Sequence, residues 1–367
     1  MTTKVKIIIR TCNIFLILQR QNFTCMTPVP SAPELENLLN EGRKTAIISH
    51  FNPDGDAIGS SVGMRLFMES RGQHATVVIP SAMPAFLDYL DKDGSIVCYT
   101  ADKERALEAV SEAGLILCLD FNRLDRAEWL AGPIASSSAV KVLIDHHLDP
   151  DKEKFNLVIS DPGASSTCEL LYRTLMSFPS IAGDPEKLDT PTLTAITTGI
   201  LTDTNNFNNS ITPDTFLIAS DMLRRGVDMD LINNLVFKRY SESRMRLMGH
   251  LLTDSMTIDS RLKASTMIIT MKDREMYSFS DGDSEGFVNL PLMISDVEVS
   301  ALFSETKDYI RVSLRSKGGV QVNALSNAYF NGGGHARAAG GRLYMPVGEV
   351  REYFLKSLEQ FLQCSHG

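Results

Sequence analysis

Histidine and aspartate are concentrated in one short stretch, His50-Phe51-Asn52-Pro53-Asp54-Gly55-Asp56. Its carboxylates would be costly to bury without a partner, and a bound cation would offset that cost. Carboxylate oxygens combined with an imidazole nitrogen favour manganese, iron, cobalt or zinc over calcium. The stretch therefore predicts a divalent cation site, although an exposed acidic turn would have a similar composition.

Other polar side chains follow apolar segments further along the chain. Asp120 follows the apolar run 115–119, and Asp145-His146-His147 ends the run that begins at Val140. Asp203 ends a segment with a helical pattern. Ligand sites in open α/β sheets form at the carboxyl ends of strands. We therefore expect these side chains to meet the residues of the first stretch.

Together these residues could hold two divalent cations about 3.5 to 4 Å apart, which can clamp a phosphoryl group and activate a water for in-line attack. Asp120 is the expected bridging ligand, and His146 is assigned to metal. His147 is expected to contact the bridging oxygen or the scissile phosphate. Asp145 is expected to orient an imidazole. The predicted ligands are His50, Asp54, Asp56, Asp120, His146 and Asp203.

The elements that position these residues have the pattern of an α/β domain. Apolar, partly β-branched runs alternate with segments of helical pattern, which predicts a mostly parallel sheet flanked by helices. The predicted strands are 45–49, 75–80, 95–99, 115–120, 140–147 and 156–161. The pattern becomes helical from residue 166.

The last third of the chain predicts a smaller α/β domain with a mixed sheet, with strands at 264–270, 296–303 and 309–315. Period-two alternation puts Arg311, Ser313 and Arg315 on one face of the last of these. The run Gly332-Gly333-Gly334-His335 follows, and its backbone N–H groups could form an anion-binding nest. Arg337 is a weaker candidate for phosphate contact.

Composition limits the function classes. A net charge of −9 argues against a non-specific nucleic-acid coat protein. Six cysteines without a Cys-x-x-Cys pair predict free thiols and a cytoplasmic location, and no segment predicts a membrane span.

The sequence predicts four parts of the chain. We expect an N-terminal extension at 1–26, a catalytic domain at 27–228, a helical linker at 229–250 and a substrate-binding domain at 251–367. The extension would be absent from the protein if translation starts at Met26.

The motifs resemble those of the DHH phosphoesterase superfamily. The matching residues are His-x-Asn-Pro-Asp-Gly-Asp at 50–56, the strand-end Asp120, Asp145-His146-His147 and Gly-Ile-x-Thr-Asp-Thr at 199–204. The glycine run at 332–334 is similar to the DHH-associated C-terminal domain. One departure is Asn205, where family members often carry glycine. Because asparagine tolerates a left-handed backbone, we expect the loop to be kept.

The resemblance implies a site for two divalent cations, with Mn²⁺ as the expected metal, on the six predicted ligands. It also implies that the C-terminal domain holds the nucleotide, with Arg315 and His335 as principal contacts and Gly333, Gly334, Arg311 and Arg337 beside them. The layout is similar to stand-alone enzymes that cleave short oligoribonucleotides (nanoRNA) and dephosphorylate 3'-phosphoadenosine 5'-phosphate (pAp). A homodimer is compatible with this group.

Three alternatives remain open from the sequence. One is a phosphodiesterase for cyclic di-AMP or its linear product pApA. A manganese inorganic pyrophosphatase shares the metal pattern, but the glycine-rich C-terminal domain indicates a larger substrate. A non-catalytic nucleotide sensor is disfavoured because all six expected ligands are present.

Overall fold

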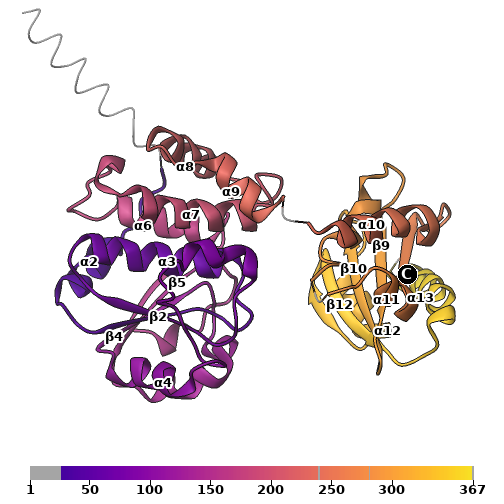
Figure 1. Cartoon of the computed structure of the whole chain (residues 1–367), viewed down its shortest axis with the longest axis horizontal. Coiled ribbons are helices and arrows are strands. Elements are labelled where there is room, and N and C mark those ends of the chain that lie inside the picture. The colour runs from indigo at the N-terminus through magenta and orange to yellow at the C-terminus, as the bar shows by residue number, and fades with distance from the viewer. Residues whose placement is uncertain (1–25, 239, 281, 366–367) are drawn as a thin grey trace, which may run out of the picture. The chain divides into compact units, whose positions relative to one another are not determined.

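The structure is a computed structural model that describes residues 26–238, 240–280 and 282–365 (Figure 1). The chain divides into two compact units between residues 239 and 240. The predicted N-terminal extension lies outside the described residues, except for Met26. The predicted linker at 229–250 contains α9 (Met229–Val236) and α10 (Glu242–His250), which fall in different units. The predicted domain boundaries remain predictions.

Within the described residues, the first unit contains a six-stranded sheet in the order β3-β2-β1-β4-β5-β6. All neighbouring strands are parallel. The order reverses between β1 and β4, so the crevice for a ligand is expected at the carboxyl ends of these two strands. The strands are β1 (Thr45–Ile48), β2 (Ala75–Ile79), β3 (Val97–Cys98), β4 (Leu115–Leu119), β5 (Val140–Asp145) and β6 (Leu157–Ser160).

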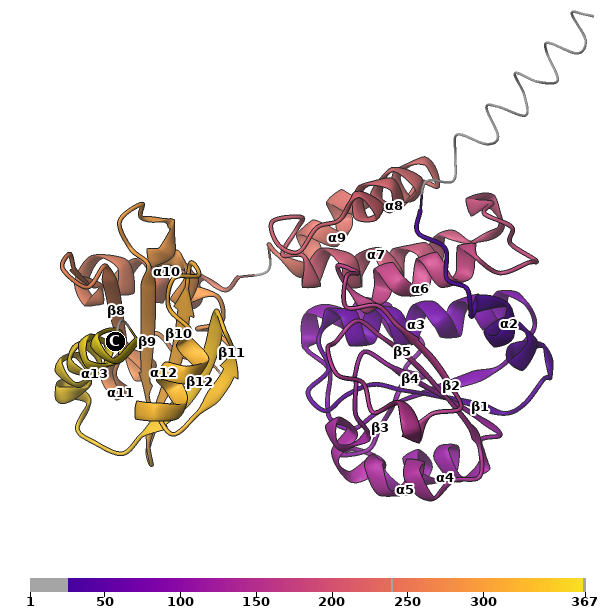
Figure 2. The same cartoon turned by 180° about the vertical axis from the view of Figure 1, so that it is seen from behind.

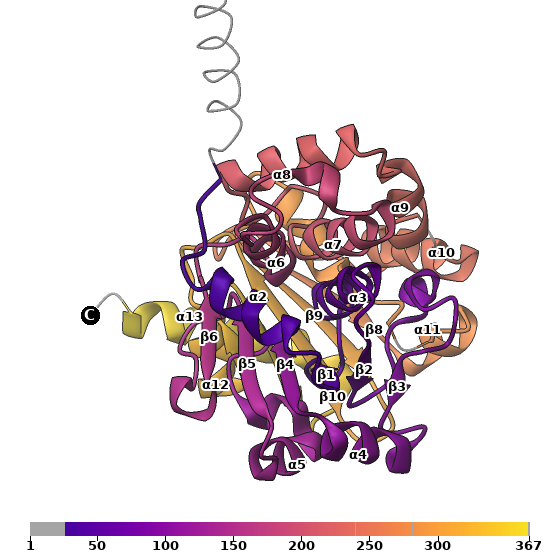
Figure 3. The ribbon, with the colours of Figure 1, turned by 90° about the vertical axis from the view of Figure 1, so that its left-hand side faces the viewer.

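Helices cover both faces of this sheet, as Figure 3 shows along the edge of the strands. Successive residues of β1 point to opposite faces, since Ile47 packs in one core and Ala46 and Ile48 in the other. One face carries α4 (Lys103–Glu112) and α5 (Ala131–Ser136). The other carries α2 (Ala32–Asn40), α3 (Gly55–Ser70), α6 (Thr167–Met176) and α7 (Thr190–Asp203), with α8 (Pro213–Arg224) and α9 outside them.

Helices α3 and α7 pack backbone against backbone. A Cβ atom added at Gly59 of α3 would lie 2.6 Å from the carbonyl oxygen of Ala195 in α7. A Cβ added at Gly199 of α7 would lie 2.9 Å from Oδ1 of Asp56. Only glycine permits this approach, which brings the first turn of α3 beside the last turn of α7.

The second unit contains a mixed six-stranded sheet in the order β11-β12-β10-β9-β8-β7, as far as the described residues extend. Strands β8 and β9 are parallel, and the other pairs are antiparallel. The strands are β7 (Thr257–Asp259), β8 (Ala264–Ile269), β9 (Val299–Glu305), β10 (Ile310–Ser316), β11 (Gly333–His335) and β12 (Ala338–Leu343). The helices besides α10 are α11 (Met271–Met276), α12 (Val322–Tyr329) and α13 (Val350–Ser365).

The two faces of the second sheet are covered differently. Helices α12 and α13 pack on one face, against residues such as Val312 and Leu314. On the other face, α10 and the 3₁₀-helix Phe287–Met293 cover β8 and β9, where Leu302 is buried. The part of this second face formed by β10, β12 and β11 lines a hollow instead. Strand β11 forms that edge of the sheet (Figure 2).

The predicted fold class is confirmed: a parallel sheet flanked by helices and a smaller unit with a mixed sheet. The burial of β10 alternates along the strand, which confirms the predicted period. The hairpin β11–β12 was not predicted as strands, because its glycine content lowers β propensity. No helix within the described residues has the length and apolar character needed to cross a membrane.

Candidate metal centre and nucleotide-binding face

His50 lies in the loop that follows β1 and is buried. Its Nδ1 lies 2.9 Å from the carbonyl oxygen of Phe51, so Nδ1 carries the proton and Nε2 offers a lone pair. Nε2 lies 3.5 Å from Oδ2 of Asp120 and 4.0 Å from Oδ1 of Asp54. The loop thus prepares His50 to bind a cation through Nε2.

The start of α3 fixes two carboxylates. Asp54 is the N-cap of the helix, and its Oδ1 accepts hydrogen bonds from the backbone N–H groups of Asp56 and Ala57 at 3.0 and 3.1 Å. Asp56 is buried, and its carboxylate accepts from the N–H groups of Thr167 and Cys168 at 2.7 and 2.9 Å. Because these N–H groups begin α6, the helix dipole stabilises the negative charge of Asp56.

Asp120 follows β4 with a left-handed backbone, at a φ of 65°. This conformation is uncommon for residues other than glycine, although aspartate adopts it more readily than most, and it recurs at functional sites. The side chain is buried, and its Oδ1 accepts a hydrogen bond from Oγ1 of Thr167 at 2.9 Å. The two oxygens of Asp120 face different histidines, Oδ2 towards His50 and Oδ1 towards His146 at 3.8 Å.

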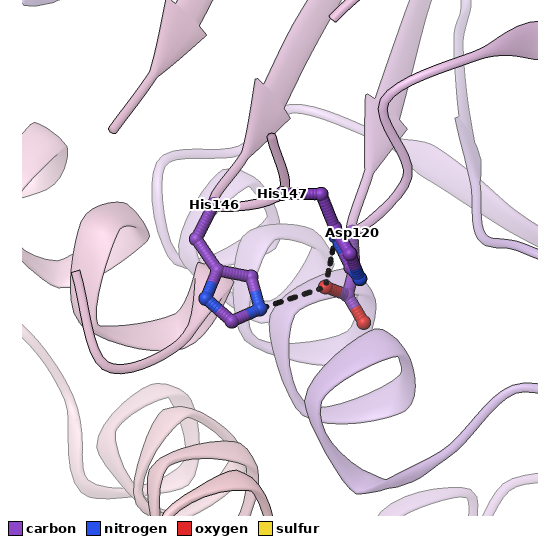
Figure 4. Close-up of side chains that lie close together, drawn as sticks. All are labelled: Asp120, His146 and His147. Atoms are coloured by element: carbon purple, nitrogen blue, oxygen red, sulfur yellow. Dashed lines mark ion pairs between the residues drawn. The ribbon is translucent and has the colours of Figure 1, made fainter. Parts of the chain in front are cut away.

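Strand β5 ends at Asp145, so the next two histidines are free to turn to the same side. Figure 4 shows His146 and His147 converging on Oδ1 of Asp120, each at 3.8 Å. Asp145 is fully buried, and its Oδ1 lies 2.7 Å from Nδ1 of His147. Asp145 therefore orients His147, whereas Nδ1 of His146 lies 3.3 Å from the carbonyl oxygen of Ala164.

Asp203 is the last residue of α7, where the helix dipole favours a cation. Its Oδ2 lies 3.5 Å from Nε2 of His146, and the same nitrogen lies 3.9 Å from Oδ2 of Asp56. The neighbouring Asn205 adopts a φ of 47°, so the left-handed backbone expected there is confirmed.

The seven side chains form three overlapping donor groups, in each of which one ligand atom per residue lies within 4.8 Å of the others. The groups are His50/Asp54/Asp120, Asp56/His146/Asp203 and Asp120/His146/His147. Burial raises the pKa of Asp56, Asp120 and Asp203, and neighbouring carboxylates raise it further. Within the described residues, the ion pairs of these three carboxylates involve only histidine. Such a donor set fits divalent cations.

The second unit gathers cationic and small residues around a hollow of about 880 Å³. Of the predicted substrate contacts, Arg311, Arg315, His335, Gly333 and Gly334 line it. Arg337 does not, since its guanidinium lies over Gly318 instead. We call the β10–β12–β11 surface of this hollow the cationic face; it comprises Tyr309, Arg311, Ser313, Arg315, His335, Ala338, Gly340, Arg342 and Tyr344.

Arg315 is the least exposed arginine of this face. Burial lowers the pKa of its guanidinium, and Glu285 opposes that shift. Its Nη1 donates to the carbonyl oxygen of Leu314 at 2.9 Å. A partly buried guanidinium without a carboxylate in contact gains most from an anionic ligand.

The glycine run has a structural role that the sequence did not reveal. A Cβ at Gly341 would lie 2.9 Å from Cβ of Phe330, and one at Gly334 would lie 2.6 Å from the carbonyl oxygen of Ala338. Gly334 of the run therefore allows the hairpin to close, and Gly341 of β12 allows it to pack against the end of α12. An anion nest at Gly333 and Gly334 remains a prediction.

Sequence reasoning missed several residues of both sites. Thr167 and Cys168 hold the carboxylates of Asp120 and Asp56, and their signal is a polar run, Ser165-Ser166-Thr167, at the start of a helix. Arg342, Tyr309 and Tyr344 line the hollow and were also missed. Arg342 lies in β12, which the glycine content of the hairpin concealed, and Tyr309 and Tyr344 adjoin β10 and β12.

Two protein-family models match the chain. The DHH family, N-terminal domain, matches residues 44–200, and the DHHA1 domain matches residues 269–363. An exopolyphosphatase-related protein from Bacteroides fragilis has a solved structure that is 36% identical, with a TM-score of 0.85. That likeness covers 92% of this chain and 98% of the other.

Two groups of relatives are similar over most of the chain. The bifunctional oligoribonuclease and PAP phosphatase NrnA of Thermus thermophilus is 29% identical over 299 residues, which cover 81% of this chain and 83% of NrnA. The cyclic-di-AMP phosphodiesterase GdpP of Geobacillus thermodenitrificans is 26% identical over 343 residues. These cover 90% of this chain but 49% of GdpP, so this chain spans about half the length of that relative.

Proposed function

Since this chain belongs to the DHH family of metal-dependent phosphoesterases, we propose that it cleaves short oligoribonucleotides and removes the 3'-phosphate from pAp. These are the two activities in the name of the NrnA relatives. We propose His50, Asp54, Asp56, Asp120, His146 and Asp203 as ligands of two divalent cations, with Mn²⁺ as the physiological metal.

One observation carries this proposal. The two oxygens of the buried Asp120 carboxylate face two separate donor groups. Oδ2 faces the group that contains His50 and Asp54, and Oδ1 faces the group that contains His146. Asp56 and Asp203 complete the second group. A carboxylate in this position is suited to bridge two cations, and a pair of cations is the arrangement that favours phosphoryl chemistry over simple structural binding.

When bound, the cations would supply Lewis acidity and an activated water for attack on phosphorus. The protein residues do the positioning. Thr167 and the start of α6 hold Asp120 and Asp56 in fixed orientations. Asp145 keeps the proton of His147 on Nδ1, so Nε2 is the ring atom that can contact the phosphate or the bridging oxygen.

The cationic face of the second unit supports a nucleotide substrate rather than pyrophosphate. Arg315 and His335 are the proposed phosphate contacts, and Gly333 and Gly334 allow close approach of the ligand. A substrate held only by its phosphoryl group would not need a second binding surface. We therefore expect Arg315→Gln to raise the KM for nucleotide substrates by about tenfold while kcat changes little; an unchanged KM would contradict this contact.

A second candidate is hydrolysis of cyclic di-AMP or of pApA. The similarity to GdpP over 90% of this chain favours it. Both candidates require the same metal centre, and they differ in the nucleotide that the second unit accepts. We further propose that the protein is cytoplasmic and forms a homodimer. Light scattering of the purified protein would test the dimer.

A substrate panel decides between these functions. The full-length protein is assayed with Mn²⁺ and with EDTA on pAp, two-nucleotide RNA, pApA, cyclic di-AMP and pyrophosphate, with Asp120→Asn as the inactive control. We expect Mn²⁺-dependent turnover of pAp and the RNA and none by the variant. Preferred turnover of cyclic di-AMP or pApA would support the second candidate. Absence of turnover on every phosphoester with Mn²⁺ bound would refute both and favour a sensor.

A further inference from the structure

The cationic face carries two pairs of polar side chains separated by small residues. Arg315 pairs across the ladder with Ala338, and Ala338 pairs in turn with His335 of β11. Four residues away on β10, Arg311 lies directly opposite Arg342 of β12. We call the first of these pairs, Arg315 and His335, the inner end of the face and the second, Arg311 and Arg342, the outer end.

The floor between the two ends is made of small residues. Ser313 pairs with Gly340, and Gly340 pairs with Gly333 on the edge strand. These residues line the same hollow as both ends. With a rise of 3.2 to 3.4 Å per residue, the Cα atoms of Arg311 and Arg315 are about 13 Å apart along the strand. This separation, with the guanidinium of Arg315 held back by its hydrogen bond to the carbonyl oxygen of Leu314, favours a separate phosphate at each end.

The outer end is electrostatically unfavourable without a ligand. Like charges directly opposite each other in an antiparallel pair destabilise it. Both Arg311 and Arg342 are exposed, and in the described part of the chain neither forms an ion pair with a carboxylate. The guanidinium of Arg342 instead lies over the ring of Tyr309, with its carbon 4.8 Å from the ring centroid. In a chain with a net charge of −9, such a pair points to an anionic ligand.

Aromatic rings extend the outer end. Tyr344 is 69% exposed, and its ring centroid lies 6.4 Å from that of Tyr309. An exposed ring beside cationic groups that contact a phosphate is the arrangement that stacks nucleobases in proteins that bind single strands. Both rings line the hollow, on the side of Arg342 away from the inner end.

We propose that the outer end is a second phosphate-binding subsite, in which Arg311 and Arg342 bind a backbone phosphate remote from the one held at the inner end and Tyr344 stacks on a base. This inference rests on the proposed function and extends it. The preferred ligand of the cationic face is then an RNA strand with several phosphates, not a mononucleotide. A strand of about five nucleotides is long enough to occupy both ends.

The test compares ligands of different length on the same variants. Wild type, Arg342→Gln and Arg342→Lys are assayed on pAp and on five-nucleotide RNA. Arg246→Gln is the matched control, because Arg246 is an exposed arginine of the same unit paired with Glu242 and remote in sequence from the cationic face. Loss of one exposed phosphate contact should raise the ratio of KM for the RNA to KM for pAp by about fivefold in Arg342→Gln. Arg342→Lys should recover part of that loss.

A binding experiment separates this proposal from the proposed function. Fluorescently labelled two- and five-nucleotide RNAs are titrated with each full-length protein in EDTA, and the dissociation constant is read from anisotropy. We expect wild type to bind the longer RNA more tightly, and Arg342→Gln and Tyr344→Ala to lose most of that advantage. Tyr344→Phe should keep it, because the ring is retained.

The outcomes are distinct. Length-dependent binding that depends on Arg342, in a protein that hydrolyses no RNA, would support the subsite and refute the proposed activity. Equal affinity of wild type for both RNAs, or equal losses in Arg342→Gln and Arg246→Gln, would overturn the subsite while leaving hydrolysis of pAp and two-nucleotide RNA intact.

Discussion

Gly59→Ala tests whether the α3–α7 contact sets the geometry of the metal centre. A methyl group at this position would lie 2.6 Å from the carbonyl oxygen of Ala195 and 2.9 Å from the backbone nitrogen of Gly199. Neither neighbour is a side chain that could rotate away, so the helices must separate. Ordinary carbon–oxygen contacts are 3.3 to 3.6 Å, so α3 and α7 would have to move apart by about 0.8 Å.

The change in the free energy of unfolding caused by Gly59→Ala is the sum of two opposing effects. Alanine gains about 1 kcal/mol over glycine from helix propensity, whereas overpacking a buried contact costs about 1 to 3 kcal/mol. With backbone neighbours on both sides, the cost should be at the upper end of that range. A net loss of about 2 kcal/mol lowers the thermal midpoint of a unit of this size by about 4 to 8 °C.

The shift should also change function, because the two helices carry different ligands. Asp54 and Asp56 lie at the start of α3, and Asp203 lies at the end of α7. Misplacing a reacting group by about 1 Å can cost about a hundredfold in rate. We therefore expect Gly59→Ala to lower kcat on pAp by tenfold or more and to weaken Mn²⁺ binding.

The measurements are differential scanning fluorimetry with and without Mn²⁺, isothermal titration with Mn²⁺ and steady-state kinetics on pAp. Gly132→Ala in α5 is the matched control, since a Cβ there would meet nothing within 4 Å. It should not lower the midpoint. A Gly59→Ala protein with wild-type midpoint, Mn²⁺ affinity and kcat would refute the argument that this contact positions the ligands.

Three further predictions concern the environment of Asp120. Burial raises the pKa of the Asp120 carboxyl in the folded state, so the free energy of unfolding of the metal-free protein falls as the pH rises through that pKa. Asp120→Asn should therefore stabilise the metal-free protein by about 1 to 3 kcal/mol at pH 8. It should also reduce the stabilisation by Mn²⁺, and thermal midpoints at several pH values would show both effects. Thr167→Val removes the hydrogen bond to Oδ1 of Asp120 and should weaken Mn²⁺ binding by about three- to tenfold, with Thr167→Ser as the conservative control in the same titration. Trp129 is the only tryptophan and lies 5.5 Å from the ring of Phe51, whose carbonyl oxygen orients His50; we expect Mn²⁺ to change its fluorescence in wild type and not in His50→Ala, and identical titration curves would contradict this.

The sequence was sufficient for the features that depend on local pattern. Apolar runs alternating with helical segments predicted the parallel sheet, and the polar residues that follow those runs predicted which side chains meet. Parallel strands expose their carboxyl ends at one edge, so residues distant in sequence, such as His50 and Asp120, converge by topology alone. The strand order that places β1 beside β4 makes these two residues neighbours.

The features that were missed depend on contacts between distant segments. The left-handed φ of Asp120 has no signal in the residue type. The polar run 165–167 marks the start of α6, but it does not show that the backbone N–H groups of Thr167 and Cys168 bind Asp56, because every residue except proline has such a group. The pairing of Arg311 with Arg342 depends on the register of β12, and a one-residue slip would have placed Arg342 on the opposite face.

The first unit gathers buried carboxylates and the second gathers arginines, so cations and nucleotides should bind to them independently. The candidate metal centre gathers buried carboxylates, which repel a phosphoryl group until cations are bound. The cationic face gathers arginines that form no ion pair with a carboxylate of the described residues, and it attracts phosphate whether or not cations are present. Affinity for nucleotides should therefore persist in EDTA, and only turnover should require the metal. If EDTA abolished nucleotide binding as completely as it abolishes hydrolysis, the metal centre would be the principal binding determinant and the role assigned to the cationic face would be wrong.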